Sequence, residues 1–258
     1  MRSGLVSGLS VRSQGKSSLL AGGGGGVPYV ASATNFDGTN DYIQRTLTSA
    51  VDGSLGTLSF WMNLNGGDGG EQFIFRINGG TSYIYRTAAN KINIYLGDNG
   101  AALKVGDTGA TSLTAASGWA HILASWDVSS GTTLFDWYIN DVQELSGAQT
   151  VNSGLIDYDG ADLTIGARQN GTLKLNACIS EFYFHQNHYL DLSVVENRRK
   201  FITAGGAPVD LGPTGSLPTS SQPIIYLPNP FGTFEQNAGY DGDFTVIGAL
   251  TECASAPA

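Results

Sequence analysis

Charged residues are scarce in this chain of 258 residues, in which Asp, Glu, Lys and Arg together make up 14%. The 13 Lys and Arg residues face 22 Asp and Glu residues, which gives a formal net charge of -9 at pH 7. A phosphate backbone is bound by clustered cations that displace its counterions, so this balance argues against nucleic acid as a partner. A surface poor in charge suits polar ligands or packing against other protein copies better than long-range electrostatic steering.

Long apolar runs are also missing. No stretch comes near the roughly 20 apolar residues that a membrane helix needs, so we expect no membrane partner. Before Gly22 the chain lacks the uninterrupted apolar run of a signal peptide. This predicts synthesis in the cytoplasm without classical secretion.

Cysteine is nearly absent, with Cys178 and Cys253 as the only two. Neither belongs to a CxxC or CxxxH spacing, so the sequence carries no zinc signature. A disulfide between them is one alternative, and two buried or idle thiols is the interpretation that we favour. Cys178 alternates with Ser180, Phe182 and Phe184 along an expected strand, which predicts a small residue in the core.

Patterns typical of catalysis are absent as well. Retaining glycoside hydrolases need two carboxyls about 5 Å apart on one face, and Glu181 has no second carboxylate two residues away. We therefore expect Glu181 to be an exposed or hydrogen-bonded strand residue. No G-x-S-x-G elbow occurs, and Gly15-Lys16-Ser17 lacks the first glycine of a phosphate loop because Ser10 stands there. The sequence predicts no enzyme, no catalytic residue and no organic cofactor.

Glycine, in contrast, is abundant: the chain has 36, well above the roughly 7% of average proteins. Such a composition predicts many turns between many strands. Five consecutive glycines, 22–26, precede Pro28 and mark a hinge after an N-terminal arm of residues 1–28. Glycine runs lose much conformational entropy on ordering, so we expect a neighbouring protein to hold this arm.

Short apolar runs separated by Asp-Gly, Asn-Gly or Gly-Gly turns extend from Tyr29 to about Gly205, with the spacing of sandwiches and barrels. Leu58, Phe60 and Met62 alternate with Ser59, Trp61 and Asn63, which predicts the two faces of one strand. Residues 73–77 and 82–86 flank Asn78-Gly79-Gly80, which predicts a hairpin. Residues 121–126 and 134–139 are the most apolar runs, so we place both in the middle of a sheet. We expect one domain over residues 29–205.

One helical pattern occurs, over residues 191–202, with Ser193 as the cap and Glu196 completing a capping box. Its apolar positions are expected to pack against the sandwich: Val194, Val195, Phe201 and Ile202. Past Gly205 prolines recur, and proline confines strands to edges or starts. Within this C-terminal segment, residues 206–258, we expect the runs 224–227 and 243–247 to add edge strands and the rest to wrap the surface or a neighbour.

Five segments, in the right order, resemble the concanavalin A-like, laminin-G-like jelly-roll family over about residues 33–202. They are residues 36–42, 58–61, the W-x-H-I-x-x-S-W-D run at 119–127, the Y-x-N-G-like hairpin at 138–141 with Asp141 in place of Gly, and 179–184 followed by Leu192-Ser193. The resemblance implies an all-β fold, an antiparallel two-sheet jelly-roll sandwich with a lectin-like domain.

The C-terminal runs 206–212, 223–227 and 237–244 resemble the tails of laminin-G-like structural proteins of tailed bacteriophages. This resemblance implies a non-enzymatic structural protein on the virion surface, in a head decoration, head fibre or tail fibre. Its partners would be other virion proteins, bound through the arm, further copies of itself in a homo-oligomer, and host-surface glycans. The alternatives are a carbohydrate-binding adhesin of a cell surface and a divergent glycoside hydrolase.

Two acidic clusters are candidates for calcium, which takes about six to eight oxygen ligands. They are Asp37, Asn40 and Asp41, and Asp157, Asp159 and Asp162. The alternative for each is turn chemistry, because Asp and Asn side chains accept hydrogen bonds from the backbone of the turn that they begin.

Aromatic residues make up 10% of the chain, and the faces of Tyr and Trp can stack on sugar rings. We expect Trp126 and Trp137 to be core residues because they lie in the apolar central runs. Four tyrosines border turns instead and are the predicted exposed stacking residues. They are Tyr83, Tyr85, Tyr95 and Tyr158.

Overall fold

The structure is a computed structural model that describes residues 29–77, 81–129, 131, 133–159 and 163–258. The arm predicted for residues 1–28 lies outside the described residues, as do the turn residues 78–80 and Asp162. Nearly all regular structure in the described part is β, and the one helix there, α1 (Val195–Arg198), has 4 residues. Among these residues no helix has the length and apolar character that a membrane span requires.

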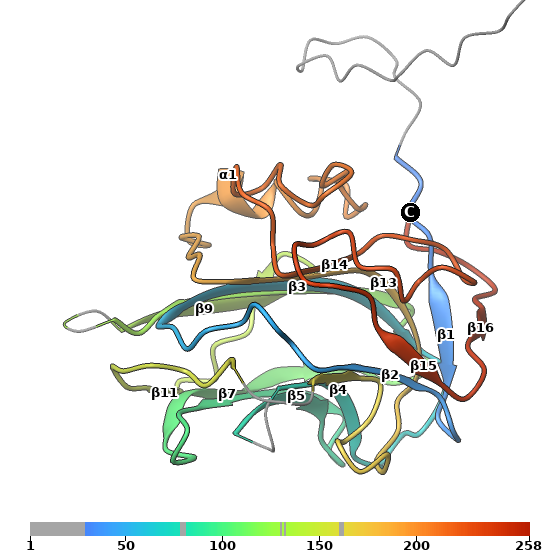
Figure 1. Cartoon of the computed structure of the whole chain (residues 1–258), viewed down its shortest axis with the longest axis horizontal. Helices are drawn as coiled ribbons and strands as arrows, with labels where there is room; N and C mark the ends of the chain where they lie inside the picture. The colour runs from blue at the N-terminus through green and yellow to red at the C-terminus, as the bar shows by residue number, and fades with distance from the viewer. Residues whose placement is uncertain (1–28, 78–80, 130, 132, 160–162) are drawn as a thin grey trace, which may run out of the picture.

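Two antiparallel sheets face each other (Figure 1). Sheet A runs in the order β10 (Val142–Gln143), β9 (Leu134–Ile139), β8 (Trp119–Asp127), β3 (Leu55–Leu64), β13 (Asn176–Gln186), β1 (Thr34–Asp37) and β16 (Thr251–Glu252), with β14 (Ile225–Leu227) also paired to β13. Sheet B runs in the order β11 (Thr150–Val151), β7 (Leu103–Ser112), β6 (Lys91–Gly97), β5 (Ser82–Arg86), β4 (Gln72–Ile77), β12 (Leu163–Ile165), β2 (Tyr42–Arg45) and β15 (Thr245–Ile247). The predicted jelly-roll sandwich and the predicted hairpin of β4 and β5 are confirmed.

The core lies between the sheets and follows the alternation of side chains along each strand. Leu58, Phe60 and Met62 of β3 point into it, and Trp126 and Trp137 are buried there as predicted. Full burial of such a side chain contributes about 1.5 to 3 kcal/mol. The sandwich therefore gains its stability from the period-two pattern that the sequence displays.

The predicted positions of the two most apolar runs are half right. β8 lies inside sheet A between β3 and β9, but β9 is the second strand of the sheet and has only the two-residue β10 beyond it. The expectation of a central position for β9 was wrong. This strand is apolar because both of its faces are buried, not because it lies in the middle of the sheet. Trp137 packs into the core, and Tyr138 packs under a segment that covers the sheet from outside.

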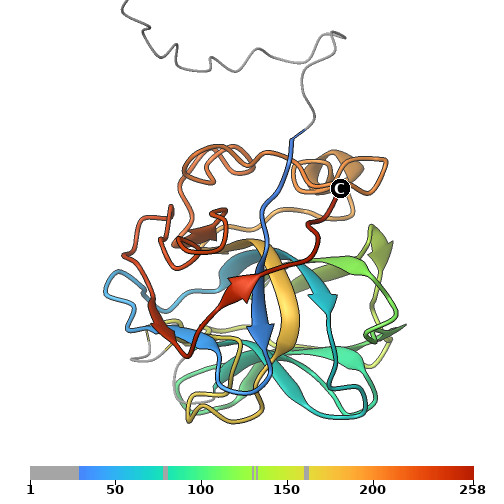
Figure 2. The same ribbon diagram turned by 90° about the vertical axis from the view of Figure 1, so that its right-hand side faces the viewer.

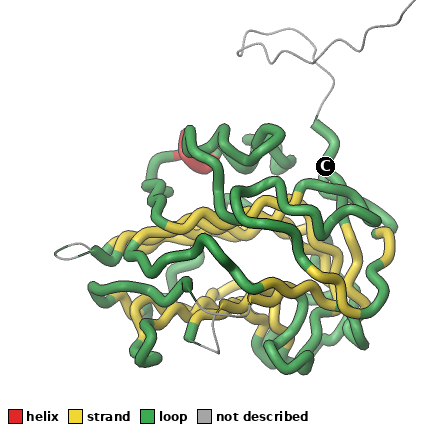
Figure 3. Tube along the Cα trace, in the orientation of Figure 1, coloured by secondary structure: helices red, strands yellow, loops and turns green. Residues whose placement is uncertain are grey.

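That segment, residues 187–223, is called the cover here. It lies over the outer face of sheet A, and Figure 3 shows it as loops around one short helix. A second hydrophobic cluster joins it to the sheet, with Leu190, Leu192, Phe201 and Leu211 of the cover against Leu123, Tyr138, Tyr183 and Tyr226 of the strands. The outer face of sheet A is therefore an internal surface.

The helix predicted for residues 191–202 shrinks to α1. Ser193 does not cap it, because its hydroxyl and its backbone N–H both donate to Asp191 Oδ1, at 2.5 and 3.0 Å. Such a local turn competes with helix initiation, and the N-cap residue is Val194, with no side-chain cap. Phe201 is buried as predicted, whereas the predicted burial of Val194 is wrong, since it is 41% exposed.

A β-bulge interrupts β13 at Glu181, which has a φ of 50°. The register with β3 shifts between Ser180 and Tyr183, so Ile179 before the bulge and Phe182 after it both face the core. A bulge moves the following side chains by one position. The predicted alternation of Cys178 with Phe182 is therefore wrong, and Cys178 faces outward with respect to the core.

Strand β13 also changes partner at this bulge. β1 pairs with residues 176–179, and β14 of the C-terminal segment pairs with residues 182–184. Glu181 is 2% exposed and accepts hydrogen bonds from the phenols of Tyr29, at 2.6 Å, and Tyr226, at 2.7 Å. One carboxylate thus ties the chain before β1 and the strand β14 to β13, which confirms the hydrogen-bonded role expected of Glu181.

The C-terminal segment completes both sheets. The runs predicted as strands form β14 and β15, with β15 at the edge of sheet B, and β16 forms the edge of sheet A beside β1. One residue after β16, Cys253 is bonded to Cys178, with the Cα atoms 6.0 Å apart. The favoured interpretation of two free thiols is wrong, because the pairing of β1 with both β13 and β16 brings the two residues together.

Both ends of the described chain consequently leave the sandwich together. In two perpendicular views the C-terminus lies beside the segment that leads into β1 (Figures 1 and 2). In Figure 1 they lie on the side of sheet A, and sheet B forms the opposite side of the molecule.

Removing the disulfide should weaken the fold measurably. It closes a loop with a sequence separation of 75 residues, and loss of such a cross-link lowers the free energy of unfolding by about 2 to 4 kcal/mol. We expect Cys178→Ala, Cys253→Ala and the double variant to lose the same amount in urea titrations under oxidising conditions, because each breaks the same bond. Losses that add up between the two single variants would contradict the bond, and wild-type protein with a reductant provides the control.

Glu181 should make stability depend on pH. Burial, opposed by the two tyrosine hydrogen bonds, raises the pKa of Glu181 from 4.5 to about 7. The folded state then binds more protons than the unfolded state between these values, so stability falls as pH rises through that window. In Glu181→Gln this loss is absent, and we expect its free energy of unfolding to gain on the wild type by up to about 3 kcal/mol between pH 4.5 and pH 8.

Urea titrations at a series of pH values measure this difference. Buried histidines titrate in both proteins and cancel in the comparison. The exposed Glu196 supplies the control, since Glu196→Gln should follow the wild-type curve. Parallel curves for Glu181→Gln and wild type would show that Glu181 does not hold its proton.

Candidate functional site

The outer face of sheet B carries a row of aromatic side chains, called the aromatic row here. Three of its members are tyrosines that point away from the core: Tyr83 and Tyr85 of β5, and Tyr95 of β6. Their strand neighbours Ile84 and Ile94 point into the core. All three tyrosines remain partly exposed to solvent. Phe73 of β4 completes the row on the same face and is 7% exposed.

Strand register brings these rings into contact. Tyr83 lies opposite Tyr95, and Phe73 lies opposite Tyr85. Tyr83 and Tyr95 stack with ring centroids 4.8 Å apart and planes within 4°, and Phe73 and Tyr85 stack at 5.3 Å and 22°. Tyr83 also contacts Phe73 at 5.5 Å and Tyr85 at 5.7 Å. Cross-strand pairs of this kind fix the rings in place without further support.

A groove of about 270 Å³ opens beside the row. The described residues that line it are three aromatic ones, Phe73, Tyr83 and Tyr85, the charged residues Glu71, Arg76 and Arg168, and the apolar Leu173. The groove thus offers flat ring faces, two guanidinium groups and one carboxylate within one small space.

The loop after β12 builds one wall of this groove. Arg168 and Thr172 pair through a backbone hydrogen bond of 2.9 Å, and Gly171, with a φ of 70°, closes the turn by donating to the carbonyl of Arg168 at 2.7 Å. The carbonyl of Leu173 accepts from the N–H of Phe73 at 2.9 Å, which joins the loop to β4. These bonds fix the backbone of Arg168 at the rim, and its guanidinium lies 6.0 Å from the ring centroid of Phe73.

The phenols of Tyr83 and Tyr85 stay protonated at neutral pH. Burial raises the pKa of Tyr83, and Tyr95 and Tyr85 add to this, whereas Arg168 and Arg76 oppose it. Burial and the charge of Glu71 raise the pKa of Tyr85. The hydroxyls are therefore neutral donors and acceptors for a ligand.

Three of the four tyrosines predicted to be exposed belong to this row, and the fourth does not. Tyr158 is fully buried, its hydroxyl accepts from Trp126 Nε1 at 2.6 Å, and it donates to the carbonyl of Leu55 at 3.0 Å. The prediction that Tyr158 stacks on a ligand is wrong because its ring fills the core and both functions of its hydroxyl are used there.

Sequence reasoning missed Phe73, Arg76 and Arg168. The spacing of Tyr83 and Tyr85 signals a shared strand face. Alternation alone would place Phe73 on the core face with Phe75 and Ile77, and a register shift between Phe73 and Phe75 brings it into the row instead. Nothing in the sequence marks Arg168, which reaches the groove through the loop that follows β12.

The first acidic cluster has the geometry of a turn. Asp37 Oδ1 accepts the backbone N–H groups of Thr39, Asn40 and Asp41 at 2.7, 3.0 and 3.4 Å. Desolvation opposes these hydrogen bonds, which nevertheless lower the pKa of Asp37. Asp41 Oδ1 accepts the N–H of Ala249 at 2.7 Å. These oxygens serve the backbone, and Asp41 anchors the C-terminal segment.

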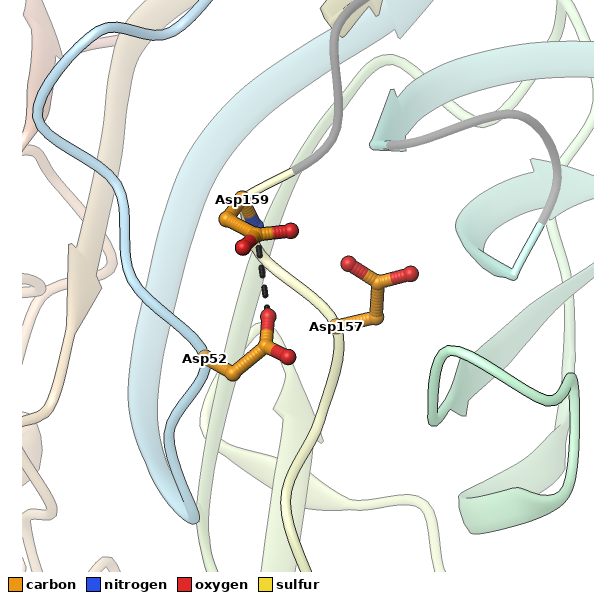
Figure 4. Close-up of side chains that lie close together, drawn as sticks. All are labelled: Asp52, Asp157 and Asp159. Carbon is orange, nitrogen blue, oxygen red and sulfur yellow. Dashed lines mark hydrogen bonds between the residues drawn. The ribbon is translucent and has the colours of Figure 1, made fainter.

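The second acidic cluster gains a member that the sequence did not indicate. Asp52, Asp157 and Asp159 present oxygens that all lie within 4.8 Å of one another (Figure 4). Asp52 joins them because Gly53 forms a β-bridge with Ile156. Three such carboxylates suit the hard oxygen ligands that Ca²⁺ prefers, and calcium binding by Asp157 and Asp159 stays a prediction.

Within this cluster some oxygens already have partners. Asp52 Oδ1 accepts the backbone N–H groups of Tyr158 at 3.0 Å and Asp159 at 3.4 Å, and Asp157 Oδ2 accepts the hydroxyl of Thr81 at 3.3 Å. Asp157 is buried and Asp159 is exposed. The cluster therefore lies at the surface with one side closed by the protein.

Comparison with known proteins identifies the fold. The family model described as the concanavalin A-like lectin/glucanases superfamily matches residues 37–190. A protein of Bacteroides ovatus, provisionally described as carbohydrate-binding, is similar in structure with a TM-score of 0.60 and 14% identity over 90% of this chain. The chain spans 62% of that protein.

Two further structures are similar over shorter stretches. A heptameric SAP-like pentraxin of Limulus polyphemus has a TM-score of 0.44 and 15% identity over 62% of this chain and 78% of the pentraxin. Domains LG4-5 of the mouse laminin alpha1 chain have a TM-score of 0.43 and 14% identity over 65% of this chain and 45% of the laminin chain. A search of curated proteins finds no match.

Proposed function

This chain belongs to the concanavalin A-like lectin/glucanase superfamily, and we propose that it is a non-enzymatic module that binds carbohydrate in the groove on the outer face of sheet B. The observation that carries this proposal is the aromatic row, four contacting rings that lie beside a polar groove on the uncovered side of the sandwich. Partly exposed aromatic rings grouped on an open sheet face are typical of a surface that binds a flat ligand.

The chemistry of the lining suits a sugar. One face of a pyranose ring is apolar and packs on Tyr83 and Tyr85, while its hydroxyls find a donor in Arg168 and an acceptor in Glu71. A volume of about 270 Å³ is near the lower end of ligand pockets, roughly 300 Å³. We expect the groove to hold one or two sugar residues of a longer chain.

The lining also favours binding without hydrolysis. Retaining glycosidases place two carboxyls about 5 Å apart. Glu71 is the single carboxylic acid among the described residues that line the groove, so these residues hold a sugar without supplying an acid and a nucleophile. A divergent glycosidase is the weaker candidate for this reason.

For the biological setting we propose the surface of a tailed bacteriophage virion, as a head decoration, head fibre or tail fibre. Both described chain ends lie on the side of sheet A and the groove on the side of sheet B (Figure 1), so anchoring through the termini would present the groove outward. In this proposal residues 1–28 contact other virion proteins, and the protein is a homo-oligomer. A disulfide persists outside reducing cytoplasm, which agrees with an exposed position.

The alternative setting is a cell-surface adhesin. It uses the same groove and the same domain, and it differs in the particle that carries the chain.

Substitution of the stacking tyrosines tests the binding site. We expect Tyr83→Ala and Tyr85→Ala each to weaken binding to glycans found on an array at least about tenfold, or about 1.4 kcal/mol. Tyr189→Ala, which removes a partly exposed tyrosine from the cover on the other side, is the matched control and should bind as wild type. Full binding by both groove variants, or no bound glycan at all, would refute the site.

Mass spectrometry of purified particles tests the setting. The chain should be present in intact virions in a fixed ratio to the capsid protein, and cryo-electron microscopy should show it at the surface. Recovery of the chain from a cell envelope and its absence from virions would favour the adhesin.

A further inference from the structure

We infer that the sugar bound in the groove carries a carboxylate, as a uronic or sialic acid does, and that Arg168 binds that carboxylate. The inference rests on the proposed carbohydrate-binding function and adds the chemical class of the ligand. It starts from the distribution of arginine in a chain with a net charge of -9.

Arginines elsewhere in the described chain are neutralised by aspartates. Salt bridges join Arg45 to Asp241, Arg86 to Asp68, and both Arg198 and Arg199 to Asp141. The two other described arginines, Arg76 and Arg168, both line the groove. Arg168 therefore places a positive charge in the groove, beside the stacked rings.

Arg168 in particular is placed to receive an anion. Its side chain is exposed, and it forms no salt bridge with any carboxylate of the described residues. The loop bonds to Thr172 and Gly171 hold its backbone, and its guanidinium lies above Phe73. A guanidinium held near a ring face in this way can direct its N–H edge into two parallel hydrogen bonds to a carboxylate.

Arg76 also lines the groove. It is 5% exposed, and its Nη1 donates to the neutral side-chain oxygen of Gln169 at 3.0 Å. Both guanidinium groups act on the hydroxyl of Tyr83, whose pKa they lower against the effect of burial. The positive charge of Arg168 thus reaches the stacking surface at Tyr83.

A sugar acid fits both parts of this arrangement at once. Its ring packs on Tyr83 and Tyr85, and the carboxylate, which projects from the ring edge, meets Arg168 at the rim. A neutral sugar uses the rings alone. Because charge-assisted hydrogen bonds are about twice as strong as neutral ones, acidic and neutral forms of one sugar should differ clearly in affinity.

Acidic oligosaccharides and their methyl esters test this directly, since esterification removes the charge and keeps the ring. The probes are trigalacturonate, a hyaluronan tetrasaccharide and sialyllactose, each measured beside its methyl ester by calorimetry at low and at physiological salt. We expect wild-type protein to bind at least one acid about tenfold more tightly than its ester, with a smaller ratio at higher salt.

Variants separate the roles of charge and stacking. Arg168→Gln should bind acid and ester equally, at the affinity of the wild type for the ester, and Arg168→Lys should keep part of the preference. Tyr83→Ala should lose both ligands. Lys91→Gln, which removes one positive charge from β6 outside the groove lining, should keep the wild-type ratio. Unchanged melting temperatures for the arginine variants show that the fold is intact.

The outcomes distinguish the two claims. Equal binding of acid and ester by the wild type, preference for sulfated sugars on an array, or an unchanged ratio in Arg168→Gln would overturn the acidic ligand and leave the groove as a sugar site. Absence of binding to every acid, every ester and every arrayed glycan would overturn the proposed function together with this inference.

Discussion

The bulge at Glu181 is the constraint from which the rest of the architecture follows. It lets β13 pair with β1 before the bulge and with β14 after it, so one strand receives both ends of the chain. The buried carboxylate holds this junction through Tyr29 and Tyr226, and the disulfide fastens the last strand beside it. The bulge also turns Tyr183 outward, where it packs under the cover. Breaking this junction would loosen the termini, the cover and sheet A together.

The two outer faces of the sandwich differ, because the cover packs on sheet A and leaves the groove on sheet B open. The cover turns the outer face of sheet A into a second hydrophobic interface, whereas the outer face of sheet B keeps partly exposed rings beside a groove. The strand register of β4, β5 and β6 places those rings in contact, and the loop after β12 adds arginine to an otherwise acidic chain. The described chain ends and strand β5, which carries two rings of the row, thus lie on opposite sides of the sandwich (Figure 1).

Local patterns predict local features of this protein well. Alternation revealed the strands, the hairpin and three of the tyrosines in the aromatic row, because period two reports directly which face a side chain occupies. Depth and distant pairing leave no such trace. Tyr158 borders a turn yet lies in the core, a non-glycine bulge at Glu181 has no sequence marker, and Cys253, Asp52 and Arg168 reach their partners only through long-range pairing of strands and loops. The helix shortened because Asp191 competes for Ser193, which spacing alone does not weigh.

We propose that a sugar binds the open face of sheet B, whereas the cover occupies the outer face of sheet A. Mapping backbone amide chemical shifts by NMR, in a deuterated sample titrated with trigalacturonate, hyaluronan tetrasaccharide or sialyllactose, tests it most directly for this 27.0 kDa chain. We expect shifts concentrated at Phe73, Tyr83, Tyr85 and Arg168, with the amides of residues 187–223 unchanged. Shifts concentrated in residues 187–223, or around Asp52 and Asp157 with the aromatic row silent, would contradict it.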